Sequence, residues 1–214
     1  MKTILFQGDS ITDVLRKRDD EIHAGMGYPL LVKGTLGFDH PNAYRFYNRG
    51  ISGDRIVDLY ARIKLHVINL KPDLVSILVG VNDAYHELLR YNGVDAGKFY
   101  KIYKMYVEEI REALPDVRFM ILEPFLLEGA ATEDTEEEPG RFAYFDKEVK
   151  LRALMARKVA EEENVPFVPL QEKFDEAAKL APNDYWLYDG VHPTTAGHEL
   201  IKREWLKCFY SLDF

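Results

Sequence analysis

The sequence predicts an α/β protein in which a five-stranded parallel sheet lies between two layers of helices, as a three-layer α/β/α sandwich. Short apolar runs rich in β-branched residues alternate with longer amphipathic stretches, which is the pattern of strands joined by helices. The run 74–79 is almost wholly apolar, as expected of a central strand that is buried on both faces. Strand–helix alternation of this kind gives right-handed crossovers and therefore a parallel sheet.

The individual elements follow from the same patterns. Strands are predicted at residues 3–8, 45–48, 74–80, 118–123 and 166–170. Segment 54–70 is predicted to be one helix, because its apolar residues recur with a period close to 3.6 residues. Further helices are predicted at residues 95–114, 142–164 and 194–209. With 214 residues and no internal repeat, the chain 1–214 is expected to form a single domain.

The composition disfavours several kinds of partner. Acidic residues outnumber basic ones by 36 to 28, and the net charge of −8 argues against binding to nucleic acid or to an anionic membrane. No apolar run approaches the roughly 18 residues of a membrane span, and the N-terminus does not resemble a secretory signal. A cytoplasmic location is therefore predicted. The single cysteine, Cys208, lies in an apolar stretch and is predicted to be a buried structural thiol.

The segment 128–140 is strongly acidic over residues 133–138. Two interpretations are open. The segment either forms an acidic lip beside a binding site, or it is a solvated and mobile loop.

Four short segments carry polar residues close to predicted strand ends or near the C-terminus. The carboxyl ends of parallel strands form one edge of a sheet, and ligands bind there. In the first segment, 8–12, Gly8 permits a sharp turn, and Ser10 can project from the sheet edge with its amide near a helix N-terminus. Taken alone, a serine at this place is more often a helix cap.

The second and third segments follow two further predicted strands. Segment 48–54 contains Gly50 and Gly53, which let the backbone approach a ligand, although a plain β–α turn has the same composition. Segment 80–83 places Asn82 where its amide can donate to an oxyanion or cap the next helix. Neither segment is decisive in isolation.

The fourth segment, 189–194, can bring a carboxylate and an imidazole together. Asp189 can hold the Nδ1–H of His192 and leave Nε2 free as a base, while Thr194 can cap the last helix. The same pair is compatible with a surface ion pair or with two metal ligands. A metal phosphohydrolase that uses Asp9, Asp189 and His192 is therefore an alternative, although further matched ligands are missing.

Together, the four segments resemble the sequence blocks of the SGNH, or GDSL-type, hydrolase family. Gly-Asp-Ser, a glycine, Gly-x-Asn-Asp and Asp-x-x-His-Pro occur in this order, and the resemblance extends from Ile4 to about Trp205. It implies a flavodoxin-like fold and a serine ester hydrolase that needs no metal or organic cofactor. In this pattern Ser10 is the nucleophile, His192 is the base and Asp189 is its partner.

The resemblance also implies an oxyanion hole made by the Ser10 amide, the Gly53 amide and the Asn82 side-chain amide. Gly50 ranks below Gly53 for this role, because Gly53 closes the Gly-x-x-Gly turn.

Within the family, the chain is most similar to intracellular acetylesterases that act on acetylated xylo-oligosaccharides. The similar stretches are 48–53, 71–77, 123–125 and 191–198. The similarity implies a small-molecule ester as substrate, an acetylated oligosaccharide, and a homo-oligomeric protein.

Three residues are predicted to bind the substrate: Asp9, Tyr85 and Trp186. Aromatic faces stack on pyranose rings, but the aromatic residues are equally compatible with a place in the core or in a subunit contact.

Two rival activities differ in what they require of the sequence. A lysophospholipase or thioesterase needs a long apolar acyl channel, and no segment suggests one. A catalytically silent carbohydrate-binding relative is expected to lack some of the four blocks, yet all four are intact.

Overall fold

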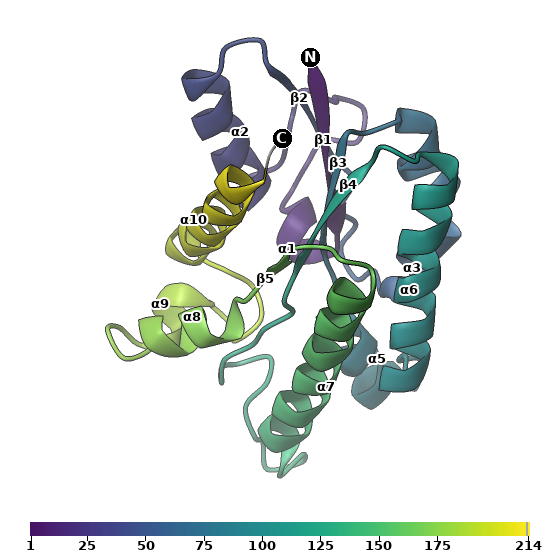
Figure 1. The fold of residues 1–214 in the computed structure, drawn as a ribbon. Helices are drawn as coiled ribbons and strands as arrows, with labels where there is room; N and C mark the ends of the chain where they lie inside the picture. Colours follow the sequence, from purple (N-terminus) through teal and green to yellow (C-terminus); the bar gives the residue numbers. More distant parts are fainter. Residues whose placement is uncertain (213) are drawn as a thin grey trace.

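Five parallel strands form one sheet in the order β2-β1-β3-β4-β5. The computed structural model describes residues 1–212 and 214. Its strands are β1 (Lys2–Gly8), β2 (Tyr44–Asn48), β3 (Leu74–Leu78), β4 (Arg118–Leu122) and β5 (Phe167–Val168). Helices cover both faces of the sheet, so the predicted three-layer α/β/α class is confirmed (Figure 1).

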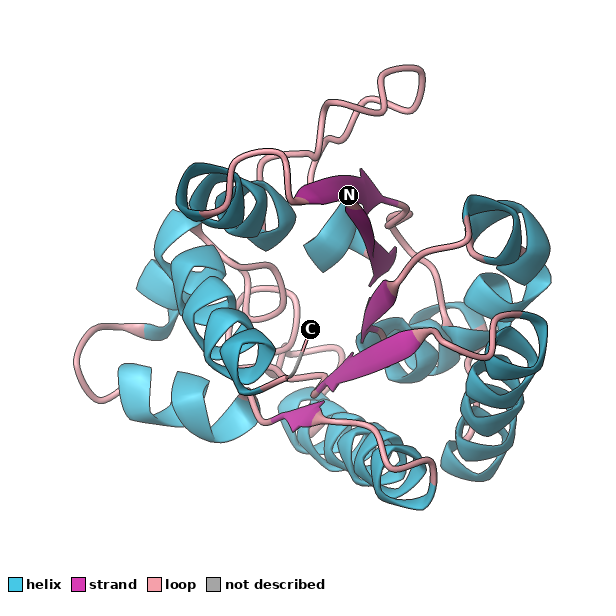
Figure 2. Ribbon diagram, turned by 45° about the horizontal axis from the view of Figure 1, so that its top comes forward, coloured by secondary structure: helices cyan, strands magenta, loops and turns pink. Residues whose placement is uncertain are grey.

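The helices divide between the two faces of the sheet (Figure 2). Helices α2, α8 and α10 pack on one face, α3, α4 and α6 on the other, and α7 contributes to both cores. The bounds are α1 (Ser10–Asp13), α2 (Tyr28–Asp39), α3 (Ile56–Ala61), α4 (Ile63–His66), the 3-10 helix η1 (Ile68–Leu70), α5 (Val81–Arg90), α6 (Ala96–Ala113), α7 (Arg141–Glu162), α8 (Gln171–Ala177), α9 (Asn183–Trp186) and α10 (Thr195–Ser211).

The pleat of the strands explains the two cores. In β1, Ile4 and Phe6 pack in the core of the α2 and α10 side, whereas Leu5 packs in the opposite core. Every residue of β3 is buried, as its apolar composition predicts for a central strand. Trp205 of α10 donates from its indole nitrogen to the buried Ser76 Oγ at 2.9 Å, which anchors the last helix to this strand.

The strand order places one topological switch point beside β1. From β1 the chain moves outward to β2, and it then returns to β3 on the other side of β1. The carboxyl ends of β1 and β3 are therefore neighbours, and such points are where α/β sheets bind ligands.

The structure corrects several predictions about elements. The predicted helix 54–70 is broken into α3, α4 and η1. The first break falls at Arg62, whose guanidinium bonds Asp54, the Gln7 side chain and the backbone oxygen of Arg49. These long-range bonds override the helical period of the sequence. Helices α2, α5, α8 and α9 were not predicted from the pattern, and β5 is shorter than the predicted 166–170.

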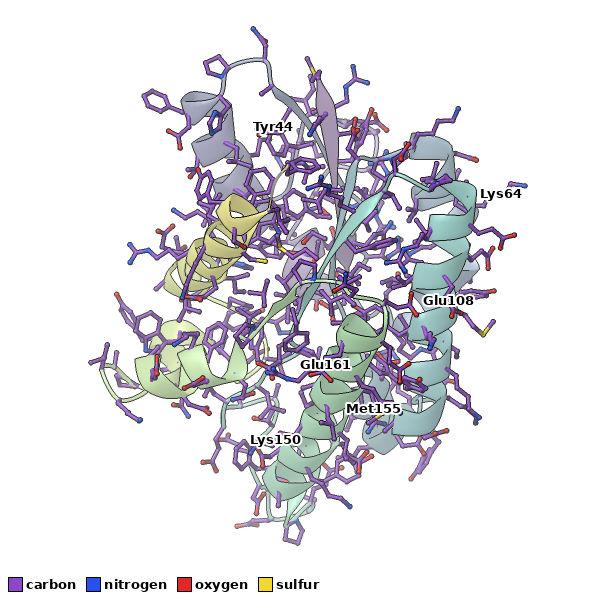
Figure 3. All side chains as sticks on the ribbon, in the orientation of Figure 1. Tyr44, Lys64, Glu108, Lys150, Met155 and Glu161 are labelled. Carbon is purple, nitrogen blue, oxygen red and sulfur yellow. The ribbon has the colours of Figure 1, made fainter. Side chains whose placement is uncertain are left out.

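Charged side chains lie exposed on the helical layers, and the C-terminal Phe214 packs on its own molecule. Figure 3 shows all side chains, and the labelled Lys64, Glu108 and Lys150 are exposed residues of the helical layers. Phe214 stacks on Tyr44 at a centroid distance of 6.1 Å. Cys208 is only partly buried, against the prediction, and burial raises the pKa of its thiol. Within the described residues, none of the helices combines the length and apolar composition that crossing a bilayer requires.

Candidate active site

Ser10 is the first residue of α1, directly after β1. The backbone turns sharply at Gly8, where an added Cβ would lie 2.3 Å from the Leu78 oxygen of β3, so only glycine fits this approach. Asp9, rather than Ser10, caps the helix, because its Oδ1 accepts from the Ile11 amide at 3.0 Å. The capping role that the sequence left open for Ser10 is thus filled by its neighbour, and the serine hydroxyl is free for other contacts.

Ser10, His192 and Asp189 form one hydrogen-bonded chain. Ser10 Oγ lies 2.9 Å from His192 Nε2, and His192 Nδ1 lies 2.7 Å from Asp189 Oδ2. The other carboxylate oxygen of Asp189 accepts from the amides of Val191 and His192, at 2.9 and 2.8 Å. The carboxylate therefore fixes both the ring and the turn that carries it, and the arrangement can move a proton away from the serine.

The electrostatics of the pair suit this transfer. The hydrogen bond to Asp189 raises the pKa of His192 above its usual value and outweighs burial, which acts in the opposite direction. Burial raises the pKa of Asp189, but hydrogen bonds from the His192 ring and from two backbone amides hold that pKa below its usual value. Asp189 is therefore a carboxylate at neutral pH, and the imidazole is a stronger base than a free histidine.

Three groups were predicted to donate to an oxyanion, namely the amides of Ser10 and Gly53 and the side-chain amide of Asn82. Among the described residues, the amides of Ser10 and Gly53 have no hydrogen-bond acceptor. Gly53 has φ +88°, a backbone conformation that favours glycine. Asn82 donates one amide hydrogen to the Asp54 oxygen at 3.2 Å, which joins the loop after β3 to the loop after β2. The predicted oxyanion donors thus come from three loops at the same edge of the sheet.

Buried polar residues fasten these loops to one another. The side-chain amide of Asn48 donates to the backbone oxygens of Thr12 and Ala24, at 2.6 and 2.7 Å, and its oxygen accepts from the Gly50 amide at 2.9 Å. Asp13 accepts from the amide and the hydroxyl of Ser52. These bonds hold the serine loop against the glycine loop.

Asp83 fastens the third loop. Its carboxylate oxygens accept from the Ile56 amide, at 3.1 and 3.3 Å, and so tie the residue after Asn82 to the start of α3. Burial raises the pKa of Asp83 well above its usual value.

The turn that carries Asp189 and His192 rests on the base of the acidic segment 128–140. The amide of Ala131 donates to the Asp189 oxygen at 2.8 Å, and the amide of Leu127 donates to the Gly190 oxygen at 2.9 Å. At Gly129 an added Cβ would lie 2.6 Å from the Gly190 nitrogen, so the close approach needs glycine.

The tip of the acidic segment is bonded to itself and to the start of α7. Asp134 accepts from the amides of Gly140 and Phe142, both at 2.9 Å, and Arg141 bonds Glu138 and the Ala131 oxygen. Of the two interpretations of this segment, the solvated mobile loop does not include the hydrogen bonds by which its base supports the turn of Asp189 and His192.

Ser10 and His192 open into one pocket of about 430 Å³, which we call the Ser10 pocket. The remaining lining residues are Ile11, Val14, Leu15, Ser52, Tyr188, Pro193 and His198. Tyr188 stacks on the His192 ring at a centroid distance of 5.6 Å. The sequence pattern singled out neither Val14, which caps the short helix α1, nor His198, which α10 brings to the pocket from the far end of the chain.

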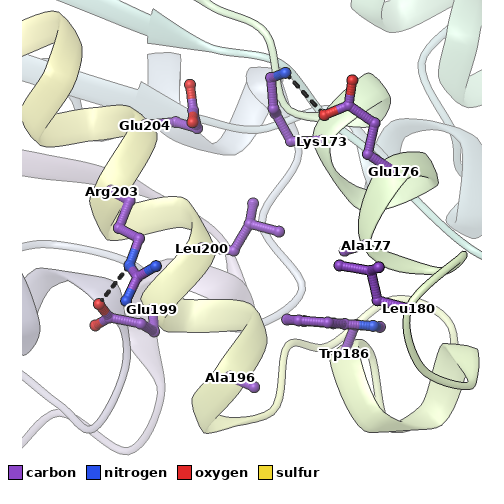
Figure 4. Close-up of a pocket in the computed structure, with 10 residues that line it drawn as sticks. All are labelled: Lys173, Glu176, Ala177, Leu180, Trp186, Ala196, Glu199, Leu200, Arg203 and Glu204. Carbon is purple, nitrogen blue, oxygen red and sulfur yellow. Dashed lines mark hydrogen bonds and ion pairs between the residues drawn. The ribbon is translucent and has the colours of Figure 1, made fainter.

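The three residues predicted to bind substrate do not line the Ser10 pocket. Asp9 is buried, with its second carboxylate oxygen unpartnered, and burial raises its pKa to about 7. Tyr85 stacks on Phe145 of α7, at a centroid distance of 5.2 Å. Trp186 lines a separate hollow of about 410 Å³ between α8, α9 and α10, where Figure 4 shows its ring beside Leu180.

The described residues offer no set of ligands for the alternative of a metal site. Within the described part of the chain, no three histidine, cysteine, aspartate or glutamate side chains come together in a way that would hold a metal ion. Asp9 is almost wholly buried, and both carboxylate oxygens of Asp189 already accept hydrogen bonds, from the His192 ring and from two backbone amides.

Comparison with known proteins decides the family. Residues 6–200 match the sequence profile of the GDSL-like lipase/acylhydrolase family. The chain belongs to this family. As a GDSL-type protein it is a serine ester hydrolase, in agreement with the prediction. It is 34 % identical over 218 residues to an acetylxylan esterase from Geobacillus stearothermophilus, and the match covers 95 % of this chain and 92 % of that protein.

Solved structures share the GDSL-type fold along the whole chain. A crystal structure of the Geobacillus stearothermophilus acetylxylan esterase superposes with a TM-score of 0.83 at 31 % identity, covering 97 % of this chain and 93 % of that chain. An alpha/beta hydrolase enzyme from the metagenome of Lake Arreo, Spain, superposes with a TM-score of 0.84 at 26 % identity, covering 100 % of this chain and 97 % of that chain.

Proposed function

We propose that the chain is an acetylesterase that removes O-acetyl groups from xylo-oligosaccharides or related oligosaccharides, with Ser10, His192 and Asp189 as its catalytic triad. The observation that carries the proposal is the unbroken hydrogen-bonded chain from Ser10 Oγ through His192 to Asp189. The choice of an acetylated sugar is supported by the similarity to the acetylxylan esterase of Geobacillus stearothermophilus.

The reaction follows from this chain of contacts. His192 Nε2 takes the Ser10 proton while Oγ bonds to the carbonyl carbon, and the carbonyl electron pair moves onto oxygen. The amides of Ser10 and Gly53 and the side-chain amide of Asn82 donate to this oxyanion. The bond to the alcohol oxygen then breaks, and His192 gives its proton to the departing sugar hydroxyl. A water deprotonated by His192 attacks the acyl-serine and releases acetate and Ser10.

Substitution of the serine tests the nucleophile. Ser10→Ala is expected to lower kcat for p-nitrophenyl acetate by about 10⁶-fold while the thermal unfolding curve stays that of the wild type. Ser211→Ala is the matched control, because Ser211 lies exposed at the end of α10 and bonds only the Cys208 oxygen. Turnover retained in Ser10→Ala contradicts the assignment, and sugar binding without any turnover by the wild type favours a silent carbohydrate-binding protein instead.

Substrate choice needs a second experiment. Acetate release is measured from acetylated xylo-, manno- and pectic oligosaccharides, together with a p-nitrophenyl ester series of increasing acyl length. We expect release from xylo-oligosaccharides and a steep fall in rate beyond the acetyl ester. A rate that peaks at octanoyl or longer esters favours a lysophospholipase or thioesterase. Activity lost in EDTA and restored by a divalent metal favours the metal phosphohydrolase alternative.

We further propose that the protein is a cytoplasmic homo-oligomer. Assembly is supported by exposed large apolar side chains, namely Leu15, which lines the Ser10 pocket, and Ile22 and Met26. Light scattering coupled to size-exclusion chromatography tests the assembly, and a single species of the 24.8 kDa monomer mass contradicts it.

A further inference from the structure

His198 lines the Ser10 pocket from the first turns of α10. It is 4 % exposed, and the little surface that it keeps opens toward the pocket. No step of the proposed reaction uses this ring. We infer that His198 donates a hydrogen bond from Nε2 to a sugar oxygen of the bound ester, an assignment that rests on the proposed function.

The tautomer of His198 is fixed by the backbone of α2. The Tyr28 amide donates to His198 Nδ1 at 3.2 Å, so Nδ1 presents a lone pair and the ring proton lies on Nε2. Burial lowers the pKa of His198 to about 4, with a smaller contribution from the charge of His192. The ring is therefore neutral at physiological pH and holds a directed N–H donor rather than a second base.

This donor has no acceptor in the protein. Across residues 1–212 and 214, no hydrogen bond from His198 Nε2 is found, and the atom is not sealed from solvent. Since the rest of the ring is buried, an acceptor that enters the Ser10 pocket can replace water at this N–H. The ring cannot turn away to find another partner without giving up the bond from the Tyr28 amide.

The Ser10 pocket is placed to receive the alcohol part of an ester. His192, which must give its proton to the leaving alcohol, lies in its wall, whereas neither Gly53 nor Asn82 is among the described residues that line it. Its volume of about 430 Å³ is in the range of small-ligand sites. Sugars carry ring and hydroxyl oxygens that accept hydrogen bonds, whereas a p-nitrophenyl ring presents none at the corresponding distance from the ester. The donor therefore selects for sugar esters.

Two substitutions separate this role from a purely structural one. In His198→Asn the amide oxygen can replace Nδ1 as acceptor for the Tyr28 amide, but nothing reaches the position of Nε2. In His198→Gln the amide nitrogen can reach the position of Nε2, but the acceptor for the Tyr28 amide is lost. The readouts are the thermal midpoint and the ratio of kcat/KM for acetylated xylobiose to kcat/KM for p-nitrophenyl acetate.

We expect His198→Asn to lower this ratio by about tenfold, carried mainly by KM for the sugar ester, because one neutral hydrogen bond is lost. His198→Gln is expected to keep most of the ratio and to lower the thermal midpoint. His40→Asn, at an exposed histidine after α2, is the control and keeps the wild-type ratio. A ratio unchanged in His198→Asn overturns the inference, and so does a fall of the same size in His198→Gln.

A spectroscopic measurement does not depend on how the variants fold. Nitrogen NMR of the wild-type protein at pH 7 is expected to show His198 protonated at Nε2 and unprotonated at Nδ1, and the opposite tautomer overturns the inference. The proposed function fails separately, when the wild type releases no acetate from acetylated xylobiose although it turns over p-nitrophenyl acetate.

Discussion

The two sides of the proposed catalytic site are held in different ways. On the nucleophile side, Asp9, Thr12 and Asn48 are buried, and the bonds of Asn48 reach residues 24 and 36 positions away in the sequence. On the base side, Asp189 and His192 are three residues apart, and their side chains remain 21 % and 34 % exposed. The nucleophile side is therefore part of the buried core, whereas the base side is a partly exposed turn on the surface of the fold.

Because of this difference, substitutions on the two sides should affect different properties, namely the free energy of unfolding and the rate of the reaction. A side chain that joins distant segments inside the core contributes directly to the free energy of unfolding, because its loss leaves several buried polar groups without partners. A side chain on a turn that is fixed mainly by its own backbone contributes much less to that free energy. The comparison therefore predicts that substitutions on the base side damage the reaction, whereas substitutions behind the nucleophile damage the fold.

Apart from loss of the nucleophile itself, the largest effect is expected on the base side. Asp189→Asn should lower kcat by about 10⁴-fold, because the amide no longer holds the Nδ1–H tautomer or stabilises a charged imidazole. Its thermal midpoint should stay close to that of the wild type. Asp184→Asn, at an exposed aspartate of α9, provides the control in esterase assays and thermal melts. A large loss of stability in Asp189→Asn would break the comparison.

The pH dependence of kcat/KM tests the same pairing of Asp189 with His192. His192 must be neutral to accept the serine proton, and its pKa lies above the ordinary histidine value because of Asp189. For the wild type, kcat/KM should therefore fall as the pH drops through a midpoint above 6.5. Without the carboxylate this midpoint should move to lower pH, while the plateau falls. A midpoint that is the same in both proteins contradicts the assigned pairing.

The second largest effect is expected on stability, at the buried residues that support the Ser10 loop. Asn48→Ala removes two hydrogen bonds to backbone oxygens of the segment after β1, at Thr12 and Ala24, and one from the Gly50 amide in the loop after β2. We expect the free energy of unfolding to fall by roughly 3–5 kcal/mol, since two backbone oxygens and one amide lose their partner inside the protein. Urea unfolding measures this loss, with Asn92→Ala at an exposed position as control. A loss no larger than that of the control would remove the contrast between the two sides.

The sequence predicted features that depend on local signals and missed features that depend on contacts between distant segments. The five strands and the meeting of Ser10, His192 and Asp189 were predictable, because strand period and the short sequence blocks that resemble the family are local signals. The break at Arg62 was not, because the partners of its guanidinium lie on other segments. His198 was missed for the same reason: its tautomer is set by the Tyr28 amide, 170 residues earlier.

Trp186 is the opposite case, a residue that was predicted to bind substrate but lies outside the Ser10 pocket. Its distance in sequence from Asp189 is small, and this suggested a place beside the substrate. The turn that follows it leaves the indole on α9, in the hollow against α8 and α10. Nearness in sequence to Asp189 does not by itself place a side chain in the Ser10 pocket, since Tyr188 lines that pocket whereas Trp186 lies in the other hollow.

The smallest effect per pH unit concerns Asp9, which belongs to the nucleophile side and is almost fully buried. Burial raises its pKa from 3.8 to about 7, so the folded state keeps a proton there that the unfolded state releases near pH 4. Between these values the folded state binds more protons, and the free energy of unfolding must fall as the pH rises. The slope contributed by one such group is about 1.4 kcal/mol per pH unit at most. Asp9→Asn cannot lose a proton, so its stability relative to the wild type should rise between pH 4.5 and pH 7, as measured by urea unfolding at several pH values. If the two stability profiles run parallel over this range, Asp9 is ionised in the folded protein, and the nucleophile side is less sealed from water than the comparison requires.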